Sequence, residues 1–242
     1  MALDLPIIYE DADFVAIDKP PGLTVHKTSA EDPQTTLADI ALELWPEIRG
    51  VGDLPAGRQG TNLRPGIVHR LDRDTSGVML LAKNQKSFEY LKSLFHEHTI
   101  RKTYLALVYG TPKEPSGTID MPVGRVGAKT TTHIHGTRDL VERSAITDYR
   151  VTRRFTDYSL LECMPRTGRT HQIRAHLKAI GVPIVGDPLY APGKETLGLD
   201  RPFLHAWKLE LTTQTGTALR LEADLPENLQ KTLDMLESKT VN

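Results

Sequence analysis

The chain has 242 residues, of which 39% are hydrophobic and 25% are charged, and its formal net charge is −1. This composition is typical of a soluble globular protein with one large domain or two modest ones. No apolar run approaches the ~18 residues of a membrane-spanning helix, the N-terminus lacks the features of a signal peptide, and the single Cys163 excludes an internal disulfide. We therefore expect a cytoplasmic protein that has no membrane partner and needs no cofactor.

The first part of the chain is predicted to alternate short strands with helices. Ile7 to Tyr9 and Phe14 to Ile17 flank an acidic turn and predict a β-hairpin. Gly50 to Arg64 is rich in Gly and Pro without periodicity, which predicts a surface loop. The other predicted elements are a helix from Thr36 to Leu44 that ends at Trp45-Pro46, a strand from Val78 to Ala82, a helix that follows Asn84 and runs to about His96, and a strand from Lys102 to Tyr109.

The second part is predicted to be mainly β. Thr111 to Arg143 is polar and Gly-rich, which favours hairpins and a mobile loop. The remaining predicted elements are paired strands at Ala145 to Phe155 and Tyr158 to Met164, a helix from Thr170 to Ile180 that stops at Gly181, strands at Phe203 to Thr212 and Ala218 to Ala223, and a closing helix from Glu227 to Leu236. Strands joined by short turns, with a few helices between them, predict an α+β fold with a mainly antiparallel sheet.

Positive charge is concentrated in two segments although the whole chain is nearly neutral. Between Arg64 and Lys102 there are eight Lys or Arg against four acidic residues. Between Arg150 and Lys178 there are seven Lys or Arg against two acidic residues. A basic surface on a neutral protein is typical of RNA binding, although solvated basic faces are the simpler interpretation of such segments taken alone.

The most distinctive motif is His69-Arg70-Leu71-Asp72-Arg73-Asp74-Thr75-Ser76-Gly77, which places two basic and two acidic side chains directly before an apolar strand. A carboxylate held among guanidinium groups is kept ionised, as a nucleophilic or basic aspartate must be at neutral pH. A polar turn with a surface ion-pair network would have the same composition. A hydrolase that uses Asp72 and Asp74 as an acid/base pair is a further alternative, but it has less support because nothing else in the sequence favours it.

This motif resembles the signature of the RluA-type pseudouridine synthases. Further segments are similar to the same family in the expected order, and the resemblance runs from about Ile7 to Leu225. They are Lys19-Pro20-Pro21-Gly22-Leu23-Thr24-Val25-His26, Arg166-Thr167-Gly168-Arg169-Thr170-His171-Gln172-Ile173-Arg174-Ala175-His176-Leu177 and Gly181-Val182-Pro183-Ile184-Val185-Gly186-Asp187-Pro188-Leu189-Tyr190. The resemblance implies a single catalytic domain over residues 1–242, without an S4-type domain, whose large mixed sheet is flanked by helices and crossed by a catalytic cleft between two subdomains.

The resemblance also implies the chemistry. Pseudouridine formation breaks the N1–C1′ bond of uridine, rotates the base and rejoins it through C5. Asp72 corresponds to the family's catalytic carboxylate, which either attacks the sugar or base or removes the C2′ proton; both roles need the ionised form. Arg174 would pair with Asp72, and Ile173 would pack under the uracil. Tyr104 corresponds to the active-site tyrosine, whose ring can stack on the base and whose hydroxyl can accept the C5 proton.

Basic residues near these positions are candidates for RNA contacts. Arg70 is the candidate to fill the gap left by the flipped nucleotide, whose extrusion costs a few kcal/mol. The other candidates, which would contact phosphate or serve as scaffold, are Arg169, Lys19 and Lys102. His69 adjoins Arg70 and is included among the substrate-binding candidates.

The histidines are expected to be structural rather than catalytic. Hydrogen-bonding histidines are commoner in cores than catalytic ones, and this interpretation covers His69, His171, His176 and His205. The spacing of His171 and His176 does not place both on one helix face, so we expect no metal site.

The sequence leaves the RNA target open between ribosomal and transfer RNA. The enzyme is expected to recognise local RNA shape and a flipped base and to act as a monomer. The alternative from another class is an RNA-binding protein or chaperone that has lost catalysis. The joint presence of Asp72, Tyr104 and Arg174 argues against that alternative.

Overall fold

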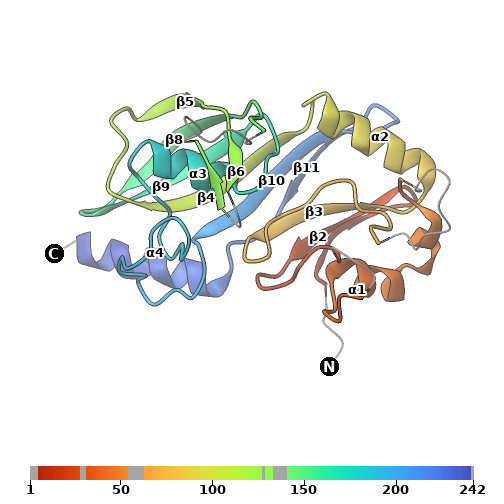
Figure 1. Ribbon diagram of the computed structural model, residues 1–242. Coiled ribbons are helices and arrows are strands. Elements are labelled where there is room, and N and C mark those ends of the chain that lie inside the picture. The colour runs from red at the N-terminus through yellow and green to blue at the C-terminus, as the bar shows by residue number, and fades with distance from the viewer. Residues whose placement is uncertain (1–4, 28–30, 54–62, 127–128, 133–140, 241–242) are drawn as a thin grey trace. The chain divides into compact units, whose positions relative to one another are not determined.

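A computed structural model of the chain shows an α+β protein and describes residues 5–27, 31–53, 63–126, 129–132 and 141–240 (Figure 1). The chain forms two compact units. The first unit contains Met1–Arg101 and Lys208–Ala223, and the second contains Lys102–Trp207 and Asp224–Asn242. Among the described helices, none has the length and apolar character needed to cross a membrane.

The first unit contains one part of a nine-stranded sheet, in which the β1–β2, β2–β3 and β10–β11 pairs are antiparallel, with helices packed against it. Its strands have the order β1-β2-β3-β10, and β11 pairs with β10. The elements are β1 (Ile7–Glu10), β2 (Phe14–Lys19), α1 (Leu37–Leu44), the 3-10 helix η1 (Pro46–Gly50), β3 (Ser76–Ala82), α2 (Gln85–His96) and β11 (Ala218–Glu222). The strand β10 (Leu204–Thr212) is shared between the units, and its residues from Lys208 onward belong to the first. The core of this unit joins strand residues such as Leu80 and Leu209 to Phe88 and Leu91 of α2.

Helix boundaries in the first unit follow from local chemistry. The backbone N–H and the hydroxyl of Thr36 both donate to Asp39 Oδ2 at 2.8 Å, and this contact between the N-cap residue and the third helical residue marks the start of α1. Asn84 accepts from the Ser87 N–H at 2.9 Å and caps α2. Both predicted helices are confirmed. The 3-10 helix was not predicted, and most of the predicted Gly50 to Arg64 loop lies outside the described residues.

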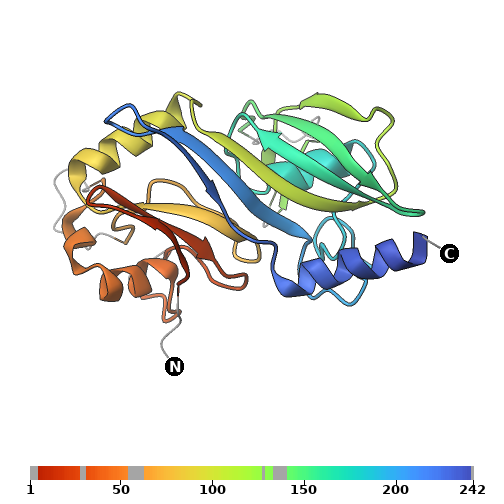
Figure 2. The same ribbon diagram turned by 180° about the vertical axis from the view of Figure 1, so that it is seen from behind.

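The second unit contains the strand order β10-β4-β9-β8-β5 of the same sheet, in which the β4–β9, β9–β8 and β8–β5 pairs are antiparallel, and a separate β6-β7 hairpin. Its elements are β4 (Arg101–Tyr109, whose first residue belongs to the first unit), β5 (Ser116–Asp120), β6 (Gly124–Val126), β7 (Lys129–Thr131), β8 (Ile146–Arg154), β9 (Tyr158–Pro165), α3 (Gln172–Ala179) and α4 (Glu227–Thr240). α4 carries the C-terminal end of the chain (Figure 2). Leu229 and Leu233 of α4 join Leu107, Leu161 and Phe203 in one core.

The start of α3 differs from the sequence prediction. The helix begins at Gln172 rather than Thr170, because His171 adopts a left-handed backbone with φ of 53°. A residue in this conformation cannot extend a right-handed helix, so the segment that precedes Gln172 is a turn. Of the hairpins predicted for Thr111 to Arg143, the described part contains β6–β7, whereas β5 pairs with β8. Residues 127–128 and 133–140 of that segment lie outside the described part.

Candidate active site

The sequence HRLD lies in a turn, residues 69–75, that leads into β3 and that we call the HRLD turn. The Leu80 N–H donates to His69 Nε2 at 2.9 Å, and the His69 ring stacks on Phe95 with a centroid separation of 4.3 Å. The Thr75 N–H donates to the Asp72 carbonyl at 3.1 Å and closes the turn. His69 therefore anchors the turn to the strand and the helix that follow it.

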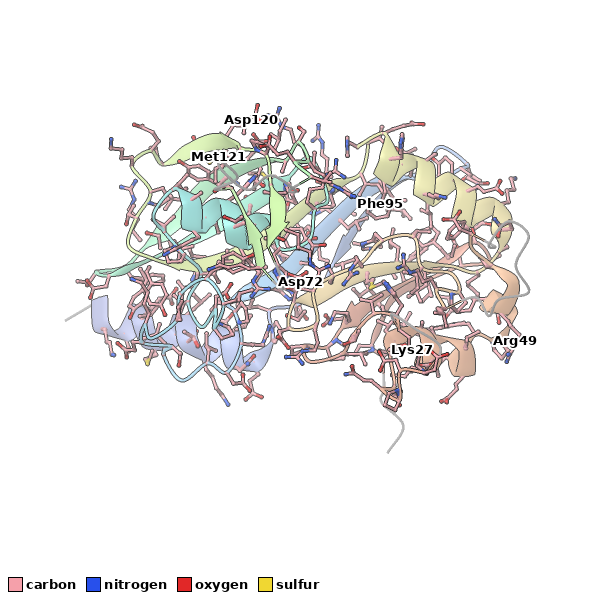
Figure 3. The ribbon with its side chains drawn as sticks, in the orientation of Figure 1. Lys27, Arg49, Asp72, Phe95, Asp120 and Met121 are labelled. Carbon is pink, nitrogen blue, oxygen red and sulfur yellow. The ribbon has the colours of Figure 1, made fainter. Side chains whose placement is uncertain are left out.

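Charges in the HRLD turn are divided between an exposed pair and a half-buried carboxylate. Arg73 Nε donates to Asp74 Oδ1 at 3.0 Å and Arg73 Nη2 to Asp74 Oδ2 at 3.3 Å. Asp72 is half-buried and lies just before β3, where Figure 3 labels it. The Arg73–Asp74 pair therefore accounts for two of the four charges of the motif. Arg70 is exposed, and in the described part of the chain it makes no hydrogen bond or ion pair.

Lys19 is buried and bound to backbone carbonyls. It lies opposite Gly77 in the β2–β3 pair, where Gly77 has a φ of 118° that favours glycine. Its ammonium donates to the carbonyls of Pro20, Leu23 and Arg73 at 2.8, 3.0 and 2.9 Å, and the residue is 0% exposed. The sequence left two roles open, phosphate contact or scaffold, and the burial of Lys19 favours the scaffold role. Lys19 ties the segment after β2 to the HRLD turn.

Replacing Lys19 with Met should destabilise the first unit. Each buried carbonyl left without a donor costs about 1–3 kcal/mol. We therefore expect the melting temperature, measured by calorimetry, to fall by about 5 °C or more. The matched control is Lys92→Met, because Lys92 is an exposed lysine of the same unit that pairs with Asp53, and exposed pairs contribute about 0–1 kcal/mol. Equal melting temperatures for the two variants would contradict the scaffold role.

In the second unit, Tyr104 and Lys102 lie on one face of β4, since they are two residues apart on a strand. Tyr104 is opposite Cys163 of β9 and packs against the core of the unit while remaining partly exposed. Burial lowers the pKa of the Lys102 ammonium from its ordinary value. An aromatic ring and a basic group thus share this strand face.

Arg174 is held in a buried ion pair that the sequence did not predict. Its Nε donates to Asp187 Oδ2 at 2.7 Å and its Nη2 to Asp187 Oδ1 at 2.9 Å. Arg174 is 8% exposed and Asp187 is 1% exposed. The guanidinium also lies over the ring of Tyr190, with its carbon 5.0 Å from the ring centroid. The side chain is therefore fixed in direction by a two-point hydrogen bond and an aromatic face.

The backbone around Asp187 is built for this contact. Asp187 Oδ1 also accepts from the N–H groups of Leu189 and Tyr190, both at 3.0 Å. Gly186 has a φ of 73°, and a Cβ there would lie 2.3 Å from the Arg201 carbonyl oxygen, so only glycine fits. The Gly181 to Tyr190 segment was noted in the sequence for its family pattern, but roles for Asp187 and Tyr190 could not be assigned without the fold.

Hydrogen bonds fix the rest of the segment that carries Arg174. The Gln172 amide donates to the Ile146 carbonyl and the Thr147 hydroxyl at 3.0 Å each, and its oxygen accepts from the Thr167 hydroxyl at 2.7 Å. His176 is bonded to the Thr147 hydroxyl at 2.9 Å and to the Met121 carbonyl at 3.0 Å, and burial lowers its pKa. His176 is therefore structural, as predicted.

The other predicted residues of this segment are placed as follows. Ile173 is buried in the core of the second unit. Arg169 Nε donates to the Ser144 carbonyl at 3.1 Å. His171 lies edge-on to Tyr190 and within 3.3 Å of its hydroxyl through Nδ1. Among the described residues, no group of three His, Cys, Asp or Glu side chains is placed to hold a metal ion.

Comparison with known proteins decides the family. The family model described as RNA pseudouridylate synthase matches residues 13–179, a range that includes both the HRLD turn and Arg174. The chain belongs to this family. It is an isomerase that converts uridine in RNA to pseudouridine, and RNA is its substrate. The predicted family, fold class and reaction are confirmed.

Relatives of this synthase cover nearly all of the chain. It is 38% identical, over 97% of its length, to an uncharacterized RNA pseudouridine synthase of Bacillus subtilis, of which it covers 73%. It is also 38% identical, over 98% of its length, to the ribosomal large subunit pseudouridine synthase D of Nitrosomonas europaea, of which it covers 67%. The solved structure of human RNA pseudouridylate synthase domain containing 4 is similar with a TM-score of 0.74 and 26% identity, covering 96% of this chain and 93% of that one.

Proposed function

We propose that this synthase modifies uridine in large-subunit ribosomal RNA and that Asp72 is its catalytic carboxylate. The observation that carries the assignment of Asp72 is the division of charge in the HRLD turn. Arg73 is bound to Asp74 in an exposed pair, whereas Asp72 is half-buried on a turn closed by one backbone hydrogen bond and held by the side chains of Lys19 and His69. A carboxylate on such a rigid turn is positioned to act on a bound nucleotide.

The proposed reaction is balanced without an added reactant. The N1–C1′ bond breaks, a C5–C1′ bond forms, the C5 hydrogen leaves as a proton, and N1 gains a proton. Asp72 either attacks the sugar or base or removes the C2′ proton, and its ionised form is needed for both. Tyr104 stacks on the uracil and its hydroxyl accepts the C5 proton. Ile173 packs under the base.

Arg174 is the proposed partner of the catalytic carboxylate. Its bidentate bond to Asp187 and its contact with Tyr190 support this role, because they preset the direction of the guanidinium before RNA binds. Preset charges cost little reorganisation during reaction. Arg70, which is exposed and makes no ion pair with the described residues, is the proposed side chain that fills the gap left by the flipped uridine.

Ribosomal RNA is the proposed target because relatives such as the Nitrosomonas europaea protein are named for the large ribosomal subunit. The proposal includes a cytoplasmic location and a monomeric state. Sedimentation of the purified protein tests the monomeric state. The target is tested by mapping pseudouridine in total RNA from cells with the gene, without it, and rescued with wild type or Asp72→Asn. A ribosomal site restored only by wild type supports the proposal. If the only restored site lay in transfer RNA, transfer RNA would replace ribosomal RNA as the target. If no pseudouridine site changed in either RNA, the proposal would be contradicted.

Tyr104→Phe should keep RNA binding and lose most of the rate. The Phe ring retains the stacking surface, but it has no hydroxyl to accept the C5 proton, and positioned proton transfer contributes about 10²–10⁴-fold. The measurement is release of tritium from RNA labelled at uridine C5, under single-turnover conditions. Tyr158→Phe is the control, since Tyr158 is a partly buried tyrosine on β9 of the same unit. Full activity of Tyr104→Phe would remove the hydroxyl from the mechanism.

A further inference from the structure

His26 is a buried polar side chain that the proposed mechanism does not use. It is 5% exposed, and its Nδ1 has no hydrogen-bond partner. Within the described part of the chain, no hydrogen bond or ion pair involves this ring. Buried polar groups without partners are rare in folded proteins and call for an explanation. A neutral imidazole carries one N–H donor and one acceptor, so His26 keeps an unused donor.

The charged groups around His26 are basic. Burial, followed by the charges of Arg64 and Arg70, lowers the pKa of His26 to about 4, so the ring is neutral at neutral pH. Arg64 and Arg70 are both exposed at the surface. The adjacent Lys27, labelled near α1 in Figure 3, is paired with Asp39 at 3.3 Å, which compensates its charge. An N–H donor in a positive field is suited to an anion.

The fold ties the segment that carries His26 to the HRLD turn. The Lys19 ammonium binds the carbonyls of Leu23 and Arg73 at 3.0 and 2.9 Å, so these two segments are held by one group. His26 follows Leu23 by three residues, and Arg70 precedes Arg73 by three residues. All of these residues belong to the first unit. An anion held by His26 and Arg70 would therefore lie at the HRLD turn, which also carries Asp72.

We propose that His26, Arg64 and Arg70 form a subsite for a backbone phosphate of the RNA next to the target uridine. This inference rests on the proposed function, because the anion is part of the substrate that Asp72 acts on. Guanidinium groups bind phosphate through paired, charge-assisted hydrogen bonds, and the imidazole N–H adds a neutral donor. Arg70 has five N–H donors and can contact this phosphate while it fills the gap in the RNA.

The first test is an NMR titration of the histidine rings, with His26 assigned by comparison with His26→Gln. A phosphate within reach should raise the pKa of His26 by about 1–3 when a short oligouridylate is bound, because an opposite charge stabilises the imidazolium. Inorganic phosphate and uridine monophosphate are the comparison ligands. An equal rise with inorganic phosphate alone would assign the subsite to free phosphate instead. An unchanged pKa of His26 in a complex saturated with oligouridylate would overturn the proposal.

The second test separates this subsite from catalysis. Arg64→Gln should lower RNA affinity and reduce the slope of log affinity against log salt by about 1. His26→Phe should lower RNA affinity with a smaller change in that slope, because the lost donor is neutral. Both variants should affect KM more than kcat. If Asp72 were not the catalytic carboxylate, only Asp72→Asn would show it, by keeping the kcat of wild type.

Controls keep this second test decisive. His96→Phe is the matched control, since His96 is an exposed histidine of the same unit, and it should leave RNA affinity unchanged. The melting temperature of each variant is measured first. If His26→Phe does not fold, Arg64→Gln and the NMR titration still decide. Wild-type affinity and salt slope in folded Arg64→Gln would overturn the proposal.

Discussion

Asp72→Asn should lower the single-turnover rate of pseudouridine formation by roughly 10⁴-fold or more, the scale on which removal of a nucleophile or base acts. Asparagine has nearly the same shape as aspartate but cannot ionise, so neither attack nor proton removal is available to it. The substitution leaves the Thr75 N–H bond to the residue 72 carbonyl and the Arg73–Asp74 pair in place. RNA affinity should therefore stay within about threefold of wild type, because the phosphate contacts that dominate affinity are unchanged.

The measurement combines tritium release from RNA labelled at C5 with a filter-binding assay on the same transcript. Asp74→Asn is the matched control, because it lies two residues away in the same turn and removes an exposed ion pair worth about 0–1 kcal/mol. Its rate should remain near that of wild type. If Asp74→Asn lost as much rate as Asp72→Asn, the turn as a whole would matter rather than the Asp72 carboxylate. Equal loss of binding in Asp72→Asn would make Asp72 a structural residue.

Local signals were sufficient for most of the secondary structure. Thr36 followed by Asp39, and Asn84 followed by Ser87, mark helix starts through hydrogen bonds between residues three apart, so a sequence shows them directly. The start of α3 was placed too early because His171 takes a left-handed backbone, which histidine rarely adopts. The ring of His171 contacts Tyr190, a residue far along the chain, and no local pattern reports such a contact.

The candidate site residues show the same division between what local motifs indicate and what only long-range contacts determine. Motifs identified the positions, because Asp72, Tyr104 and Arg174 are chemically informative residue types in a recognisable order. What each side chain contacts depends on burial and long-range pairing. A lysine in a basic family motif suggests phosphate binding, yet Lys19 is fully buried and its ammonium donates to three backbone carbonyls. The Asp187 carboxylate was likewise not recognised, because its partner Arg174 comes from a different segment.

Asp187→Asn should cost about 3–5 kcal/mol of unfolding free energy, because removing one partner of a buried ion pair is strongly destabilising. The Arg174 guanidinium is 8% exposed and would lose both of its ionic hydrogen bonds to Asp187. Asn can still accept from the Leu189 and Tyr190 N–H groups, so the turn itself can persist. Denaturant unfolding measures the loss. The matched control is Asp148→Asn, whose bidentate pair with Arg166 is exposed and should contribute at most about 1 kcal/mol.

A double variant, Asp187→Asn with Arg174→Met, separates folding from catalysis. Removing both members of the buried ion pair leaves no half of that pair in the core, so we expect most of the lost stability to return. Activity should not return, because Arg174 is the proposed partner of the catalytic carboxylate. A double variant as unstable as Asp187→Asn would place the cost in the turn rather than in the ion pair. A double variant that regained activity would remove Arg174 from the proposed mechanism, while recovery of stability alone would assign Asp187 to both the fold and the presetting of Arg174.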